Sequence, residues 1–164
     1  MAFRLTDQII GSQAVTDHST VLNHPLGTIA RGADATLGGA EFIYLKGVAS
    51  TIVGSIVNYD DAFQTALDTA AVTGPSRPLA VAMSANVASE YGWYQISGLA
   101  VAAKEATVSF ADGAGLGATA GLAVAVATGT VLQGAVVRTV ASAKSGVTTV
   151  AIAINRPHGP SDVS

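Results

Sequence analysis

The chain has 164 residues, a formal net charge of −3 and no cysteine, which excludes disulfides and thiolate metal sites. The weak negative charge gives no electrostatic basis for binding nucleic acid or an anionic membrane. Charged residues make up only 12% of the chain, about half of the roughly 25% typical of soluble domains, so either a membrane or neighbouring proteins should cover much of the surface.

The N-terminal region is polar and irregular, and we expect residues 1–25 to form an extended arm. Residues 26–164 are long enough for a single β domain. The first ten residues lack a basic start followed by a long apolar core, so no signal peptide is indicated. We therefore expect synthesis and use in the cytoplasm, or in a particle assembled there.

Short stretches with a period of two residues predict strands along the rest of the chain. Turn-forming residues separate them every 8 to 15 residues, which is typical of an antiparallel β-sandwich or barrel. The sequence thus predicts an all-β, jelly-roll-like fold with at most one or two short helices. The predicted strands are 27–30, 41–49, 50–59, 79–83, 91–101, 106–110, 122–127, 136–142 and 150–154.

Three of these strands place alanine on one face and larger aliphatic residues on the other, at 79–83, 122–127 and 150–154. A strand face exposed to water normally carries Thr, Lys, Glu or Ser. We therefore expect the alanine face to lie against another sheet, another subunit or a lattice partner. The alternative is an ordinary solvent-facing surface of small residues.

The segment "DDAFQTALDTAAV" (60–72) is ambiguous between helix and strand. Asp60 or Asp61 is suited to capping a short helix over 61–71. Alternation of Phe63, Thr65 and Leu67 equally fits a strand.

The glycine-rich stretch "SFADGAGLGATAGLAVAVATG" (109–129) resembles both a dinucleotide-binding turn and a membrane helix. A dinucleotide site needs a helix after the glycines and an acidic residue about 20 positions later, yet no Asp or Glu lies between Asp112 and Asp162. A membrane span needs more Leu, Ile, Phe and Val. The period-two run at 122–127 favours a glycine loop that leads into a strand.

No catalytic or metal-binding pattern is found among the histidines and carboxylates. His18, His24 and His158 lack the i, i+4 spacing of a helical metal site. The adjacent Asp60 and Asp61 follow a predicted strand, where such a pair usually caps or turns the chain. We therefore expect no enzymatic activity, no metal and no cofactor.

The aromatic stretch "EYGWYQ" (90–95) is the best candidate for an interface. Aromatic residues dominate interface energetics, so Tyr91, Trp93 and Tyr94 are the predicted anchor residues. A buried aromatic cluster and a carbohydrate-stacking platform are the alternatives.

Two central stretches stand out, "LGTIARGADATLGGAEFIYLKGVAST" (26–51) and "GPSRPLAVAMSANVASEYGWYQISGLAV" (74–101). They resemble small proteins of tailed bacteriophages that are encoded near the major capsid protein. The proteins they resemble are capsid decoration, or cement, proteins, which stabilise the head. The C-terminal third departs from this pattern into a run of Ala, Gly and Val.

The resemblance implies a structural protein on the outer surface of an assembled capsid. Its partners would be the major capsid protein and further copies of itself, as a dimer or trimer, with no nucleic acid or membrane involved. Another virion component, such as a head fibre or a carbohydrate-binding tail module, is the alternative function.

Overall fold

A computed structural model describes residues 3–6, 13–69, 76–126, 131–138 and 148–160. These residues form strands and no helix, which confirms the all-β fold class. The strands are β1 (Arg4–Leu5), β2 (His18–Ser19), β3 (Ile29–Asp34), β4 (Gly38–Lys46), β5 (Ile56–Tyr59), β6 (Thr65–Leu67), β7 (Leu79–Ala82), β8 (Tyr91–Ala103), β9 (Gly117–Thr119), β10 (Leu122–Val124), β11 (Gln133–Val137) and β12 (Thr149–His158).

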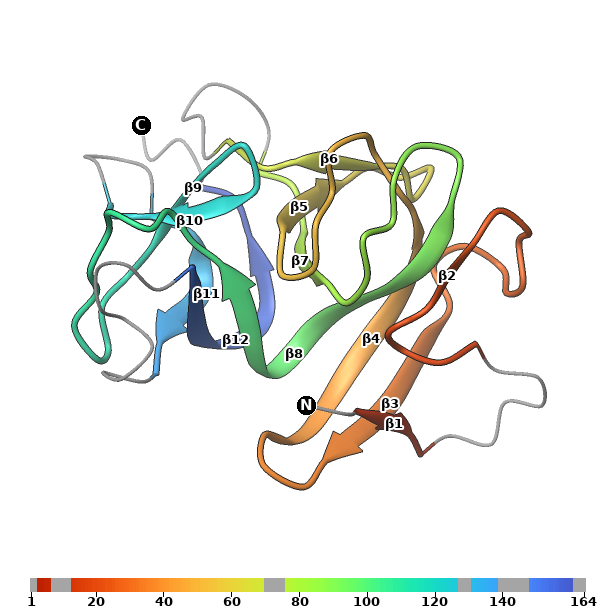
Figure 1. Cartoon of the computed structure of the whole chain (residues 1–164), viewed down its shortest axis with the longest axis horizontal. Coiled ribbons are helices and arrows are strands. Elements are labelled where there is room, and N and C mark those ends of the chain that lie inside the picture. The colour runs from red at the N-terminus through yellow and green to blue at the C-terminus, as the bar shows by residue number, and fades with distance from the viewer. Residues whose placement is uncertain (1–2, 7–12, 70–75, 127–130, 139–147, 161–164) are drawn as a thin grey trace.

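Most strands belong to one antiparallel sheet, with the order β1-β3-β4-β8-β7-β5-β6. Strands β2 and β12 also pair with β8, and β11 extends the sheet beyond β12. Strands β9 and β10 form a separate hairpin (Figure 1). The sheet folds over on itself in the manner of a sandwich without closing into a barrel.

The long strand β8 connects the two parts of this sheet. Up to Ser97 it pairs with β4, and from Ser97 to Ala103 it pairs with β12. Gly98 lies at this change of partner with a φ of +99°, and a Cβ there would lie 2.5 Å from the carbonyl oxygen of Gly39. Only glycine is suited to that conformation and that close approach. Figure 1 shows β8 turning sharply at its middle.

The central core is the set of apolar side chains enclosed by β4, β8, β7 and β5. Strand β6 returns toward β4, because Thr65 Oγ1 donates to the carbonyl of Lys46 at 2.9 Å and Lys46 N donates to Phe63 O at 3.1 Å. The curled sheet therefore surrounds these side chains on most sides. The buried members of the central core are Ile43, Leu45, Val57, Ala80, Ala82, Tyr94 and Ile96.

The alternation of β7 places its two faces in different cores. Leu79 and Val81 pack into a large core formed with β8, β11, β12 and the β9-β10 hairpin. Ala80 and Ala82 face the central core, and all four residues are buried. The alanine face of 79–83 thus lies against other strands of the same curled sheet, whereas the expectation was a separate sheet, another subunit or a lattice partner.

The alanine face of 122–127 is oriented differently from the expectation. Ala123 is fully buried in the large core, whereas Leu122 and Val124 are half-buried. The cause is the two-residue turn at Ala120 and Gly121, both at positive φ, which sets the register between β9 and β10. This register places the small alanine inward.

The N-terminal segment packs onto the sheet, whereas the sequence predicts an extended arm over 1–25. Phe3 and Val15 are buried in an aromatic core with Phe42, Tyr44 and Trp93. Apolar side chains at these two positions remove water from the outer face of β3, β4 and β8. The described residues of 1–25 are therefore part of the folded domain, and residues 7–12 lie outside the description.

Of the two alternatives for 61–71, helix or strand, the described part contains the strand β6 (Thr65–Leu67) and no helix. Asp60 Oδ1 accepts hydrogen bonds from the backbone N–H of Ala62 and Gln64 at 2.9 and 3.0 Å. Phe63 then adopts a φ of +58° before β6 begins. The carboxylate that was expected to cap a helix instead closes a tight turn.

Two other predicted strands are shorter or missing. Of residues 50–59, only 56–59 are strand, because a loop bends at Gly54. Gly54 N donates to Ala82 O, and Gly54 O accepts from Ala103 N, both at 2.8 Å. Residues 106–110 form a turn and a loop instead of a strand. Lys104 Nζ donates to Val108 O at 2.7 Å within that turn, and Phe110 fills the large core.

Residues 113–116 of the glycine-rich stretch form a loop that runs beside β11. Gly113 N donates to Val137 O at 2.8 Å, and Val137 N donates to Ala114 O at 2.9 Å. Leu132 N donates to Leu116 O at 2.9 Å, so the loop occupies the free edge of that strand. Within the described residues, no helical segment reaches the length and hydrophobicity that a membrane crossing requires.

The tight packing around Ala80 predicts that added volume there destabilises the fold. Ala80→Val should lower the free energy of unfolding by about 1–3 kcal/mol, because extra methyl groups force strain into a filled core. Ala66→Val on β6 is the control, since Ala66 is exposed and the substitution carries the same strand preference. Urea denaturation measures both, and equal stability of the two variants would contradict the assigned packing.

Candidate interaction surface

The aromatic residues predicted as interface anchors are mostly inside the molecule. Trp93 and Tyr94 are fully buried, and Tyr91 is half-buried. Both faces of β8 are covered, so neighbouring aromatic residues on this strand enter two different cores. The prediction that Trp93 and Tyr94 anchor a partner is therefore corrected, and the alternative of a buried aromatic cluster applies to them.

Trp93 is held by a polar and aromatic cluster contributed by the N-terminal segment. Its indole Nε1 donates to Gln13 O at 3.1 Å, and Tyr44 Oη donates to Gln13 Oε1 at 3.0 Å. The His24 ring lies edge-on to Tyr44 with centroids 5.1 Å apart and tilted against Trp93 at 5.3 Å. His24 is thus a packed core histidine, with only 7% of its surface exposed.

Tyr94 lies on the opposite face of β8 in a polar part of the central core. Burial raises the pKa of its phenol to about 12, and the side chains of Thr65, Asn86 and Thr51 oppose part of that rise. Asn86, Thr51 and Thr65 are themselves buried. The phenol therefore remains protonated throughout the physiological pH range.

The exposed aliphatic side chains are concentrated in three surface segments, residues 17–22, 48–53 and 86–90. Eight large apolar residues are exposed in the described chain, and five of them lie in these segments. We call these five residues the apolar loop surface. They are Val21, Leu22, Ile52, Val53 and Val87.

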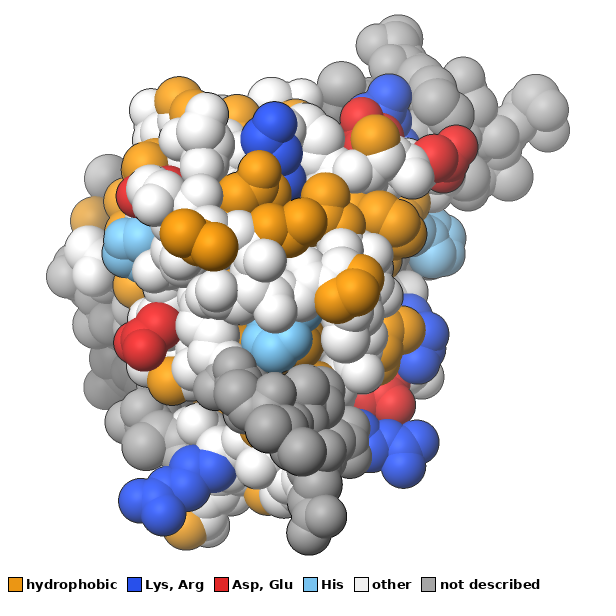
Figure 2. Space-filling view, turned by 90° about the vertical axis from the view of Figure 1, so that its right-hand side faces the viewer, with side chains coloured by type: hydrophobic (Ala, Val, Ile, Leu, Met, Phe, Trp, Pro, Cys, Tyr) orange, Lys and Arg blue, Asp and Glu red, His pale blue; other side chains and the backbone are white. Residues whose placement is uncertain are grey.

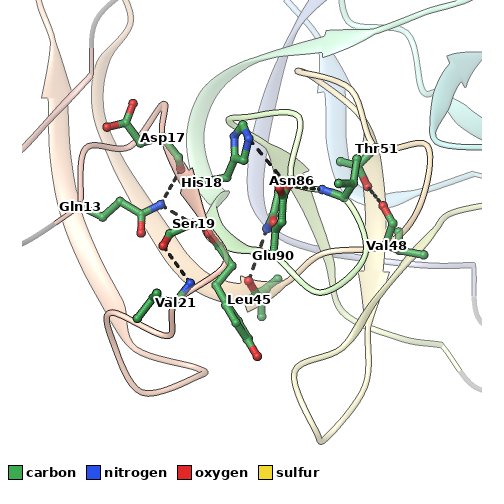
Figure 3. Close-up of polar contacts among 12 residues, drawn as sticks. Gln13, Asp17, His18, Ser19, Val21, Leu45, Val48, Thr51, Asn86 and Glu90 are labelled. Carbon is green, nitrogen blue, oxygen red and sulfur yellow. Dashed lines mark hydrogen bonds and ion pairs between the residues drawn. The ribbon is translucent and has the colours of Figure 1, made fainter.

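Segments 17–22 and 86–90 lie beside the first residues of β8, and the 48–53 segment begins next to them. His18 on β2 pairs with Gly92, and its Nε2 lies 3.7 Å from Glu90 Oε2. Glu90 Oε2 also accepts from Val87 N at 3.1 Å, which fixes the 86–90 turn (Figure 3). Gly47 N donates to Glu90 O at 2.8 Å and thereby brings the start of the 48–53 loop alongside.

Local hydrogen bonds hold the shape of each segment. Thr51 Oγ1 donates to Val48 O at 2.7 Å, and Val21 N donates to Ser19 Oγ at 3.0 Å. Gln13 Nε2 donates to Asp17 O at 2.7 Å (Figure 3). The backbone of the segments is thus ordered by the protein itself while their aliphatic tips stay in solvent.

The face that carries β2 lies on the right-hand side of Figure 1. Figure 2 shows apolar side chains grouped across its upper half, with a basic side chain among them and other charged side chains near the edges. An ordered surface with exposed aliphatic side chains is suited to contact with another protein.

Sequence reasoning missed this surface in favour of the aromatic residues. A usable signal was present, because Val21-Leu22 and Ile52-Val53 are adjacent aliphatic pairs beside turn-forming residues. In an alternating strand, one member of such a pair would face each side. In a loop, both can face the solvent, and here both pairs do.

The remaining polar residues considered from the sequence lie apart from one another. His158 Nδ1 is 3.0 Å from Ser76 Oγ near the end of β12, and Asp60 belongs to the turn before β6. In the described ranges, no three His, Asp or Glu side chains gather closely enough to hold a metal ion.

Comparison with known proteins finds no matching family model, no matching curated protein and no matching solved structure.

The burial of Trp93 predicts a loss of stability when its side chain is truncated. Trp93→Ala should lower the free energy of unfolding by about 3–5 kcal/mol, because a large side chain leaves a cavity in the aromatic core. Thermal and urea denaturation of the purified protein measure this change. Wild-type stability in that variant would mean that the ring lies outside the core.

The raised pKa of Tyr94 predicts a loss of stability at high pH. The unfolded chain releases the Tyr94 proton near pH 10, before the folded protein does. The contribution of this group to the free energy of unfolding is therefore complete below pH 10 and is lost as the pH rises toward 12. Because of this group, the free energy of unfolding falls by at most about 1.4 kcal/mol per pH unit. Urea denaturation across this range should show a shallower decline for Tyr94→Phe than for wild type, and parallel curves would argue against the shift.

Proposed function

We propose that this protein is a bacteriophage capsid decoration protein that binds the outer surface of an assembled capsid. The observation that carries the proposal is the apolar loop surface, in which five of the eight exposed aliphatic residues occur together. The binding partner is the major capsid protein, and the protein acts structurally by linking neighbouring capsid subunits and stabilising the particle.

The position of the two stretches that resemble decoration proteins supports this proposal. Residues 26–51 include β3 and β4, and residues 74–101 include β7 and most of β8. These strands are adjacent in the order β3-β4-β8-β7, so the two stretches form one continuous part of the sheet. They also supply most of the 48–53 and 86–90 segments of the apolar loop surface.

The low charge of the chain supports binding through apolar and backbone contacts. Eight basic and eleven acidic residues are spread over 164 positions. Contacts of this kind depend little on ionic strength, because screening acts on charges. Individual contacts would be weak, and an assembled shell presents several neighbouring subunits together, which raises the effective concentration for each further contact. We propose that copies of the protein associate as a dimer or trimer on the shell for the same reason.

A carbohydrate-binding tail module fits the observed geometry less well. Stacking on a sugar requires exposed aromatic rings, but Trp93 and Tyr94 are buried. The exposed side chains of the apolar loop surface are aliphatic and have no aromatic face, so protein contact suits them better.

The proposal predicts preferential binding to the assembled capsid of the phage that encodes the protein. In cosedimentation, the purified protein should bind mature capsids more tightly than soluble capsid subunits. Binding should persist near 1 M salt, where the Debye length is only about 3 Å. Equal affinity for free subunits, or release by modest salt, would contradict the proposed binding mode.

Substitutions in the apolar loop surface test where binding occurs. Leu22→Asp and Val53→Asp should each weaken capsid binding by about tenfold or more, which corresponds to about 1.4 kcal/mol. Ile29→Asp is the matched control, because Ile29 is a comparably exposed aliphatic residue on β3, outside the three segments. Circular dichroism and melting should verify the fold of all three variants. A defect in the control alone would place the contact elsewhere.

A further inference from the structure

A group of polar atoms is buried beneath the apolar loop surface. Ser84 Oγ, Asn86 Oδ1 and Tyr94 Oη are inaccessible to solvent and have no hydrogen-bond partner among the described residues. Ser84 and Asn86 lie just beyond β7, and Tyr94 is on β8. Buried polar groups in folded proteins are almost always hydrogen-bonded, so three such atoms in one region require an explanation.

The side chains of Ser84 and Asn86 lie against Gly92, which has no side chain. A Cβ at position 92 would lie 3.1 Å from Ser84 Oγ and 3.2 Å from Asn86 Nδ2. Gly92 and Tyr94 are two residues apart on β8 and therefore face the same side of the sheet. The side chain of Asn86 is also close enough to Tyr94 to influence its pKa.

The hydrogen-bonding capacities of the three groups are complementary to those of water. The hydroxyls of Tyr94 and Ser84 can each donate a proton, and Asn86 Oδ1 can only accept one. A water molecule can accept from both hydroxyls and donate to the amide oxygen, which gives it three hydrogen bonds. Buried waters typically make about three.

A direct network does not satisfy the same groups. The Asn86 amide is oriented by a long bond from its Nδ2 to Leu45 O at 3.5 Å, and its Oδ1 remains without a partner. The Tyr94 phenol lies near Thr65, Asn86 and Thr51, yet no side chain in the described residues meets it with hydrogen-bond geometry.

We propose that an internal water molecule binds beside Gly92 and bridges Tyr94, Asn86 and Ser84. This water connects the 86–90 turn to β8, directly beneath the surface segments that this turn and Thr51 help to form. The inference concerns the folded chain itself and holds independently of what binds to the apolar loop surface.

A high-resolution crystal structure tests the proposal directly. An ordered water should lie about 2.7–3.2 Å from Tyr94 Oη, Asn86 Oδ1 and Ser84 Oγ. Direct hydrogen bonds among these three groups, or absence of density for water between them, would overturn the proposal.

Magnetic relaxation dispersion of water in solution provides an independent test. The dispersion amplitude should fall by the contribution of one long-lived water in Tyr94→Phe. It should stay unchanged in Tyr44→Phe, the matched control, because Tyr44 already has a protein partner in Gln13. If Tyr94→Phe does not fold, Ser84→Ala removes another ligand of the same water and should produce the same fall. An amplitude equal to wild type in the folded variant would overturn the proposal.

Discussion

The pairing of β8 with strands on both of its edges is the constraint on which the rest of the molecule depends. This strand bonds to β2, β4, β7 and β12, and it changes partners at the bend near Gly98. Its N-terminal half separates the aromatic core from the central core, and its C-terminal half forms a wall of the large core. A side chain at position 98 would meet the backbone of Gly39, so loss of this glycine would disturb all three cores together.

The abundance of small residues follows from this arrangement. Where both faces of a strand are covered, each face packs into a core of limited volume. On β7, Val81 packs into the large core and Ala82 into the central core. Alanine lets the curled sheet close around Tyr94 and Ile96, and larger residues fill the space beneath the β9-β10 hairpin. Covered strand faces offer few positions for charge, which accounts for part of the unusually low charge of the chain.

Alternation in the sequence predicted the strands with two buried faces best. The run at 79–83 matches β7, and the aromatic run from Tyr91 matches β8, because their periodicity reflects real alternation between two environments. It failed where a few backbone contacts override local preference. Gly54 converts most of a β-branched segment into a loop through bonds to Ala82 and Ala103 on distant strands. Contacts of that range carry no signal in a local window.

The same distinction explains why the candidate site was only partly predictable. Period-two alternation indicates that Trp93 and Tyr94 face opposite sides, but it does not reveal what covers each side. Burial of Trp93 depends on Gln13, which is 80 residues away and whose carbonyl accepts the indole proton. Once the N-terminal segment covers one face and β6 closes over the other, Trp93 and Tyr94 have no surface left for a partner, and Tyr91 is half-buried. The exposed apolar area then falls to the loops at its beginning, where adjacent aliphatic residues have no opposing strand to cover them. A partner that binds there meets a backbone already ordered by hydrogen bonds such as Val87 N to Glu90 Oε2, so little conformational entropy opposes each contact.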